Sequence, residues 1–328
     1  SALLAETGGT LVRRSDLPAL GQFSLIATFP AQALRDRFAA ELAARVPATG
    51  LSVPWTYTFA QAAPRLYAPA LLGEGQAGRC RLPRPVRIGM IDGPVDPAHP
   101  ALRGARVRHA SLVAGARVPP ADHGTGVAAL MVGEDPSGAL AGYARGADLS
   151  AVSVFTLTDQ GEETSVERVA IDRLVAEGAQ VINMSFSGPD SGALRRSLAA
   201  ASARGVVLVA AAGNDRARAI AFPAAVPEVI AVTAVDAARQ RFRLANTGPE
   251  TEFSAPGVDL YVARARGAGY ASGTSFAAPI VSALVARQIA SGTSGVEPVR
   301  ARLRAGVAPL GAGPRNPEYG WGLVQGGC

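Results

Sequence analysis

The chain of 328 residues contains no lysine, so all 32 of its basic side chains are arginines. With 26 acidic residues, the formal net charge is +6. The arginines are scattered and form no run interleaved with aromatic residues, which argues against a nucleic-acid site. No apolar stretch reaches the roughly 18 to 20 residues that a bilayer span needs, so we expect no transmembrane segment.

Cysteine and histidine are also scarce. The two cysteines, Cys80 and Cys328, permit one disulfide, and if they pair the compartment is oxidising. No His/Cys cluster has zinc spacing and no Asp-rich loop is of the EF-hand type, so neither a metal site nor a required cofactor is predicted. The first ten residues lack the charged and apolar regions of a signal peptide, so such a segment was removed before this numbering or never existed.

From Val86 onward, short apolar and β-branched runs alternate with Ala/Leu/Arg-rich segments of helical spacing. Runs of this kind predict strands that are buried on both faces and linked by crossover helices. We therefore expect an α/β fold whose mostly parallel sheet carries helices on both faces, with functional sites at the carboxyl ends of the strands. The runs are "VRIGMI", "LSAVSVF", "QVINMSF", "GVVLVAAAG" and "VIAVTAV".

The first part of the chain differs from this pattern. Residues 1–80 are predicted to form a small α+β domain with a linker arm, and residues 81–328 the larger domain. The run "QFSLIATF" predicts a strand and "AQALRDRFAAELAARV" an amphipathic helix, whereas the Pro/Ala/Tyr-rich stretch that follows them is interpreted as an irregular connection.

Ser275 lies in "SGTSFAAP", directly before an apolar run. It is either the first residue of an ordinary buried helix or a nucleophile, and a nucleophilic serine needs a base and a group that orients the base. His123, in "DHGTGVAALMVG", is the favoured base because it precedes an apolar segment and is followed by glycines that leave room for close approach. His99 and His109 are interpreted as structural.

Asp92 is the favoured orienting acid because it closes a predicted strand. Asp96, in a Pro-rich turn, and Asp122, beside the favoured histidine, remain alternatives. Asn214 follows another predicted strand, where its amide would stabilise an oxyanion together with the Ser275 backbone N–H, although a plain Gly–Asn turn is the simpler interpretation.

Five segments together resemble the motifs of the subtilisin-like serine proteases over roughly residues 84 to 325, including their order of Asp, His, Asn and Ser. This resemblance implies a serine endopeptidase in which Asp92 orients His123, His123 acts as base and then acid, Ser275 attacks and Asn214 stabilises the oxyanion. It also implies a polypeptide substrate and a secreted or periplasmic location. The segments are "IGMIDGPVDPAHPAL", "DHGTGVAALMVG", "INMSFSGP", "VAAAGND" and "SGTSFAAPIVSALVA".

By the same resemblance, an extended substrate adds as a strand along one edge of the cleft, and a second segment forms a pocket wall. Ser187 stands where the family usually has a glycine, which predicts a narrower or more polar primary pocket. The residues implied in substrate binding are Ser185, Phe186, Ser187 and Gly188 at the edge and Ala211, Ala212 and Gly213 in the wall.

Gly93 and Pro94 follow the acid where the family usually has Thr or Ser and then Gly, so a hydroxyl is missing beside Asp92. The alternative function is accordingly a weak or inactive regulatory or binding protein with this fold, and a third is an esterase or ligase. Residues 1 to about 72 resemble a propeptide that acts as intramolecular chaperone and inhibitor, with cutting in "LYAPALLGEG", unless they are a permanent accessory domain. Family members often bind structural calcium, for which the sequence indicates no site.

Overall fold

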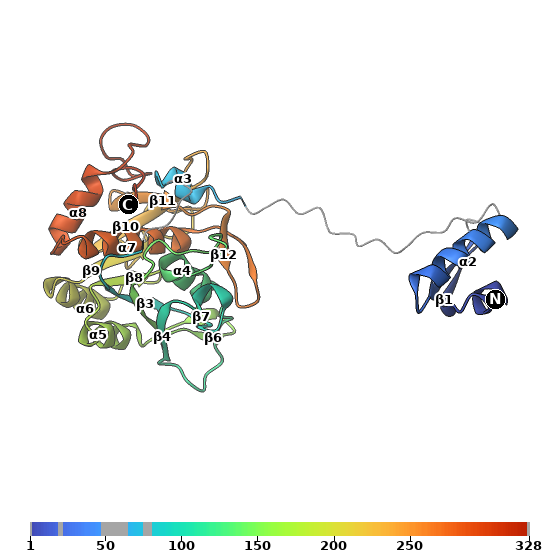
Figure 1. Cartoon of the computed structure of the whole chain (residues 1–328). Coiled ribbons are helices and arrows are strands. Elements are labelled where there is room, and N and C mark those ends of the chain that lie inside the picture. Colours follow the sequence, from blue (N-terminus) through green and yellow to red (C-terminus); the bar gives the residue numbers. More distant parts are fainter. Residues whose placement is uncertain (1, 19–21, 47–64, 75–80, 327–328) are drawn as a thin grey trace. The chain divides into compact units, whose positions relative to one another are not determined.

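The computed structural model describes residues 2–18, 22–46, 65–74 and 81–326 (Figure 1). The chain divides into two compact units, residues 1–62 and 63–328. The division falls before the boundary expected at residue 80, because residues 65–74 pack into the larger unit. Cys80 and Cys328 both lie outside the described residues, so their pairing stays a prediction.

The smaller unit contains an antiparallel hairpin and two helices. β1 (Thr10–Leu17) pairs with β2 (Gln22–Thr28), and α1 (Ala2–Glu6) and α2 (Gln32–Arg45) flank the hairpin in sequence. The strand and the helix predicted here are thus found at β2 and α2. β1 was not predicted, because its charged residues break the alternation that identifies a half-buried strand.

The larger unit is built on a seven-stranded sheet in which each neighbouring pair is parallel. The five predicted runs form its five inner strands, which confirms the predicted fold class. The two edge strands were missed because they carry mixed polar and apolar residues. In spatial order the strands are β11 (Thr251–Pro256), β10 (Val229–Val235), β9 (Val207–Ala211), β8 (Val181–Met184), β3 (Arg87–Asp92), β5 (Asp148–Ser153) and β4 (Arg106–Ser111).

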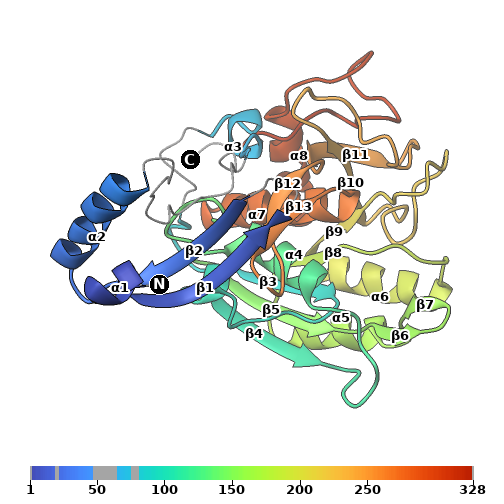
Figure 2. The same cartoon turned by 90° about the vertical axis from the view of Figure 1, so that its right-hand side faces the viewer.

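Helices cover both faces of this sheet, as predicted. Side chains of β3 alternate between the two faces, so Ile88 and Met90 join one apolar cluster and Ile91 joins the other. The first cluster includes α4 (Asp122–Val132), α7 (Thr274–Ala290) and α8 (Val296–Ala305), and the second includes α5 (Glu167–Ala176) and α6 (Gly192–Ala203). Figures 1 and 2 show α5 and α6 side by side, apart from α4 and α7.

Residues 65–74, which include the short helix α3 (Ala68–Leu71), form a strap that is part of this larger unit. The Tyr67 hydroxyl donates to the Val258 carbonyl at 2.5 Å, and Leu72 is fully buried. Glu74 and Arg287 of α7 form a buried ion pair. A cut in "LYAPALLGEG" would therefore break a segment that is packed and hydrogen-bonded into the core.

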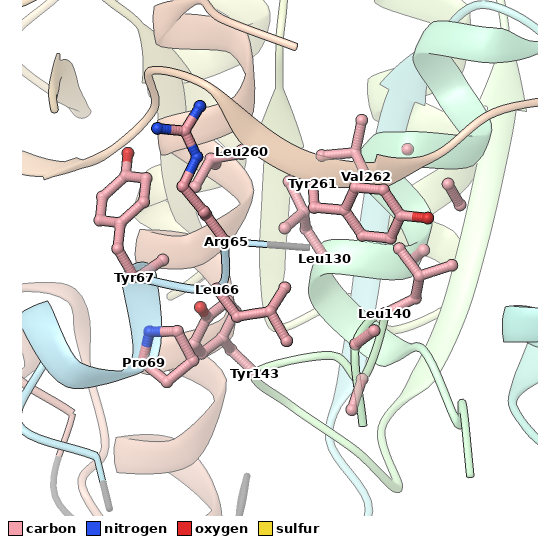
Figure 3. A pocket seen from close by; sticks show the side chains of 16 residues that line it. Arg65, Leu66, Tyr67, Pro69, Leu130, Leu140, Tyr143, Leu260, Tyr261 and Val262 are labelled. Carbon is pink, nitrogen blue, oxygen red and sulfur yellow. The ribbon is translucent and has the colours of Figure 1, made fainter. Parts of the chain in front are cut away.

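Figure 3 shows the side chains of the strap next to those of other segments of the larger unit. Leu66, Tyr67 and Pro69 line a hollow together with Leu260 and Val262 of β12 (Leu260–Ala263), the strand that pairs with β13 (Ala268–Ala271). The hollow has a volume of about 30 Å³ and is lined by none of the predicted catalytic residues.

No helix among the described residues combines the length and the apolar character that a membrane crossing requires. No group of three or more His, Cys, Asp or Glu side chains there is arranged to hold a metal ion.

Candidate active site

Asp92 and His123 meet at the carboxyl edge of the sheet. Asp92 ends β3 and is 2% exposed, while His123 lies in the first turn of α4. The His123 Nδ1–H donates to Asp92 Oδ1 at 2.8 Å, and the same oxygen accepts from the Gly93 backbone N–H at 2.7 Å. This arrangement leaves the other ring nitrogen, Nε2, available for proton transfer, which is the arrangement required of an acid that orients a base.

Gly124 allows this close approach. A Cβ atom at Gly124 would lie 2.4 Å from the carbonyl oxygen of Pro94, a distance that no side chain tolerates. The amino end of α4 therefore rests directly against the loop after β3, and a glycine is the residue that permits it. As expected, the glycine after His123 leaves room for close approach, and the segment that approaches it is the backbone of the loop after β3.

The two alternative acids have structural roles. Asp122 Oδ1 accepts from the Ala265 backbone N–H at 3.1 Å. Asp96 Oδ1 accepts from the Ala98 N–H at 2.9 Å, as expected of a turn residue. In the part of the chain that the structure describes, neither forms a hydrogen bond or an ion pair with the His123 ring, so Asp92 is the carboxylate that orients it.

The other two histidines are also engaged elsewhere. His99 accepts from the Ala101 N–H through Nδ1 at 3.1 Å, and its Nε2 lies 2.8 Å from the Gly267 carbonyl oxygen, to which it donates. His109 lies in the edge strand β4, and its Nε2 is 2.6 Å from Ser153 Oγ. Both fit the structural interpretation.

Ser275 occupies the first turn of α7, and a buried chain of hydrogen bonds fixes it there. Ser282 Oγ donates to Asn183 Oδ1 at 2.9 Å, Asn183 Nδ2 donates to Ser185 Oγ at 2.9 Å, and Ser185 Oγ donates to the Ser275 carbonyl at 2.7 Å. Sequence reasoning missed Asn183 and Ser282. The sequence signal that could have identified Asn183 is its place inside an apolar run that predicts a buried strand, because a buried amide must find hydrogen-bond partners.

The base and the nucleophile lie on neighbouring helix ends. The ring of Phe276, which follows Ser275, is 5.1 Å from the His123 ring between centroids. In the described part of the chain, the hydrogen bond of the His123 ring goes to Asp92, and none joins it to Ser275. A base and its nucleophile are often separated in unliganded sites and draw together when substrate binds.

Asn214 lies beside the nucleophile. Its Oδ1 accepts from both the backbone N–H and the hydroxyl of Thr274 at 3.0 Å, so the amide orientation is fixed. A Cβ built at Gly273 would lie 3.2 Å from Ser275 Oγ and 3.5 Å from Asn214 Nδ2, which places both atoms on the same side of Gly273. An N–H donor adjacent to the serine oxygen is the feature that an oxyanion site needs.

The residues expected at the substrate edge have mixed surroundings. Ser185 is buried and uses its hydroxyl within the protein, whereas Ser187 and Gly188 are exposed. Phe186 packs edge-on against Phe155 at 5.5 Å, and the Gly188 N–H donates to the Phe222 carbonyl at 2.9 Å. The exposed part of this edge follows β8 at the same rim as the triad.

The expected pocket wall follows β9. Ala211 and Ala212 are buried, and Gly213 has a φ of +102° that favours glycine. The Gly213 N–H donates to Thr274 Oγ1 at 3.2 Å. This wall segment is thus tied to the same threonine that fixes Asn214.

Burial and two neighbouring carboxylates shift the pKa of His123. Burial lowers the pKa of His123, but the charge of Asp92, its hydrogen bond and the charge of Glu162 outweigh this effect, so the pKa lies above 6.5. The ring nevertheless keeps 40% of its side-chain surface exposed, so solvent reaches it. Asp92 and Glu162 are the charged groups that act on the ring.

Comparisons with known proteins bear on this arrangement. The model of the family described as "Subtilase family" matches residues 84–322. Subtilisin E of Bacillus subtilis (strain 168) is 34% identical over 218 residues, which are 62% of this chain and 55% of that protein. The chain thus spans just over half the length of this relative.

Solved structures are similar over most of the larger unit. The patellamide maturation protease PatA has a TM-score of 0.64 and 31% identity, covering 75% of this chain and 96% of that one. The prenylagaramide maturation protease PagA has a TM-score of 0.62 and 29% identity, with coverages of 73% and 90%. The subtilisin-like protease Apa1 from Pseudoalteromonas sp. AS-11, at 18% identity and a TM-score of 0.65, with coverages of 73% and 91%, shares the fold.

Proposed function

Because this chain belongs to the subtilase family, we propose that it is a serine endopeptidase that hydrolyses peptide bonds through an acyl-enzyme on Ser275. The observation that carries the proposal is the 2.8 Å bond from His123 to the buried Asp92, at the rim where the Ser275 helix begins. A base that is oriented in this way, beside a serine at a helix end, is the arrangement that nucleophilic catalysis requires.

In the proposed mechanism, His123 Nε2 removes the proton from Ser275 Oγ as that oxygen attacks the scissile carbonyl. The proton then passes from His123 to the leaving amine. In the second half of the reaction, His123 takes a proton from a water molecule as that water attacks the acyl carbon, and it returns the proton to Ser275 Oγ as the acyl bond breaks. Asp92 remains ionised and holds the Nδ1–H throughout. Asn214 Nδ2 and the Ser275 N–H stabilise the oxyanion, and no cofactor takes part.

The substrate in this proposal is an extended polypeptide that pairs with the exposed edge at Ser187 and Gly188. Residues 1–62 are proposed to act as a partner of the protease, propeptide-like or accessory, because the larger unit holds the whole triad and its own core. We also propose a secreted or periplasmic location. It is supported by a relative named as the minor extracellular protease Epr of Bacillus subtilis, which is 31% identical over 62% of this chain.

The decisive variant is Ser275→Ala, measured on a quenched fluorescent peptide and by labelling with a serine-directed phosphonylating reagent. We expect a loss of at least about 10⁵-fold in kcat, as befits removal of a nucleophile, and labelling of the wild type at Ser275 alone. Ser291→Ala, at the opposite end of the same helix, is the matched control and should keep full activity.

Labelling at another residue, or undiminished turnover by the alanine variant, would contradict the assignment. A wild type that binds peptide without cleaving it would instead support the regulatory or binding protein. Comparison of amide and ester substrates distinguishes a peptidase from an esterase on the same triad.

A further inference from the structure

A small hairpin stands at the same rim as the triad. It consists of β6 (Thr156–Thr158) and β7 (Gly161–Glu163) and follows β5, the neighbour of β3 in the sheet. The Val154 N–H, two residues before the hairpin, donates to the Asp92 carbonyl at 3.1 Å, and the Leu157 N–H donates to the Arg117 carbonyl at 2.7 Å. The hairpin is therefore anchored to the catalytic strand and to the loop that leads into α4.

The hairpin carries three acidic residues, and two of them have partners within the protein. Asp159 lies 3.9 Å from the Arg117 guanidinium, and Glu163 Oε1 accepts from the Thr158 hydroxyl at 3.2 Å. Glu162 is exposed and, among the described residues, forms neither a hydrogen bond nor an ion pair. Its carboxylate is the one left free for a ligand.

The charge of Glu162 reaches the active site. Successive side chains of a strand point to opposite faces, so Glu162 and Glu163 lie on different sides of the hairpin. The charge of Glu162, unlike that of Glu163 or Asp159, acts on the His123 ring. An unpaired carboxylate whose charge acts on the His123 imidazole thus lies on a hairpin that is anchored to the strand of Asp92.

We infer that Glu162 is a specificity-determining residue, which favours polypeptides that carry an Arg or Lys side chain next to the scissile bond. The inference rests on the proposed protease function. A guanidinium or ammonium that is brought beside Glu162 gains a charge-assisted partner, and a bound peptide excludes part of the screening water. Because the whole chain has a net charge of +6, its overall field does not favour basic substrates, so the preference is local to one substrate position.

The test uses matched quenched fluorescent peptides in which arginine or its neutral isostere citrulline occupies each position around the cleavage site in turn. For the wild type, we expect kcat/KM to favour arginine by roughly twofold to fivefold at one position, the range of a partly exposed ion pair. Glu162→Gln should remove that preference, and Glu163→Gln, on the opposite face, should keep it. The preference should also shrink as salt is raised.

The outcomes separate this inference from the proposed function. Cleavage of the citrulline peptides and labelling of Ser275 report the protease itself, whatever the charge preference. If these peptides are cut but the arginine-to-citrulline ratio is one at every position, or is the same in Glu162→Gln as in the wild type, the specificity role is overturned. If no peptide is cut and Ser275 is not labelled, the protease proposal fails and this inference with it.

Discussion

At the scale of single residues, the surroundings of Asp92 depart most from what the family resemblance implies. Oδ1 has two donors, but Oδ2 is buried and has no hydrogen-bond partner among the described residues. The sequence shows that a hydroxyl is missing beside Asp92 at Gly93, and Oδ2 is the oxygen of this carboxylate that could accept from one. A buried carboxylate oxygen without a donor carries a desolvation cost.

Gly93→Ser tests this point. A Cβ at Gly93 would lie 3.6 Å from Pro119 Cγ, an ordinary contact, so the side chain fits. A hydroxyl that donates to Asp92 Oδ2 should raise the free energy of unfolding by about 1 kcal/mol, measured by urea denaturation.

Gly93→Ala is the control for that substitution, because it adds the Cβ and reduces the freedom of the unfolded chain without adding a donor. Equal stability of the serine and alanine variants would show that Oδ2 gains nothing from the hydroxyl.

The pH dependence of activity also belongs to this scale. A general base must be neutral, and the pKa of His123 lies above 6.5, so kcat/KM should fall as the pH is lowered through that raised pKa. Glu162→Gln removes one of the charges that raise it, so the acid limb should move to lower pH, while Glu163→Gln should leave it in place. A pH–rate profile on a neutral peptide measures this, and an acid limb that stays fixed in both variants would contradict it.

At the scale of elements, two helix ends and the carboxyl end of β3 position the triad. α4 delivers His123 because Gly124 lets its first turn rest on the loop after β3. α7 delivers Ser275 because Ser282, inside that helix, is bonded to Asn183 of β8. The position of the nucleophile thus depends on buried polar contacts as well as on the apolar packing of α7 against the sheet.

At the scale of the whole molecule, the two compact units are unequal in function. The larger one contains the triad, both apolar clusters and the strap of residues 65–74. Without the strap, Arg287 would remain in the interior without Glu74, and a buried charge that loses its partner costs about 3 to 5 kcal/mol.

Truncation tests this division. A chain of residues 63–328 should unfold cooperatively, whereas one of residues 81–328 should have a clearly lower Tm or fail to fold, as followed by circular dichroism on heating. In the shorter chain, Arg287→Met should recover part of the loss because it removes the unpaired charge. Equal melting of the two chains would show that the strap is dispensable.

The sequence by itself determined the inner strands and the helices that link them, and through its resemblance to the subtilisin-like proteases it predicted the roles of Asp92, His123 and Ser275. These signals are local, because the spacing of apolar residues, the positions of glycines and the ends of strands can each be identified within a short segment of the sequence. Only the tertiary structure decided that residues 65–74 belong to the larger unit, that Asn183 and Ser282 hold the serine helix, and that the charge of Glu162 acts on the imidazole. Each of these depends on contacts between segments far apart in the chain, and such contacts leave no mark in the local pattern of residues.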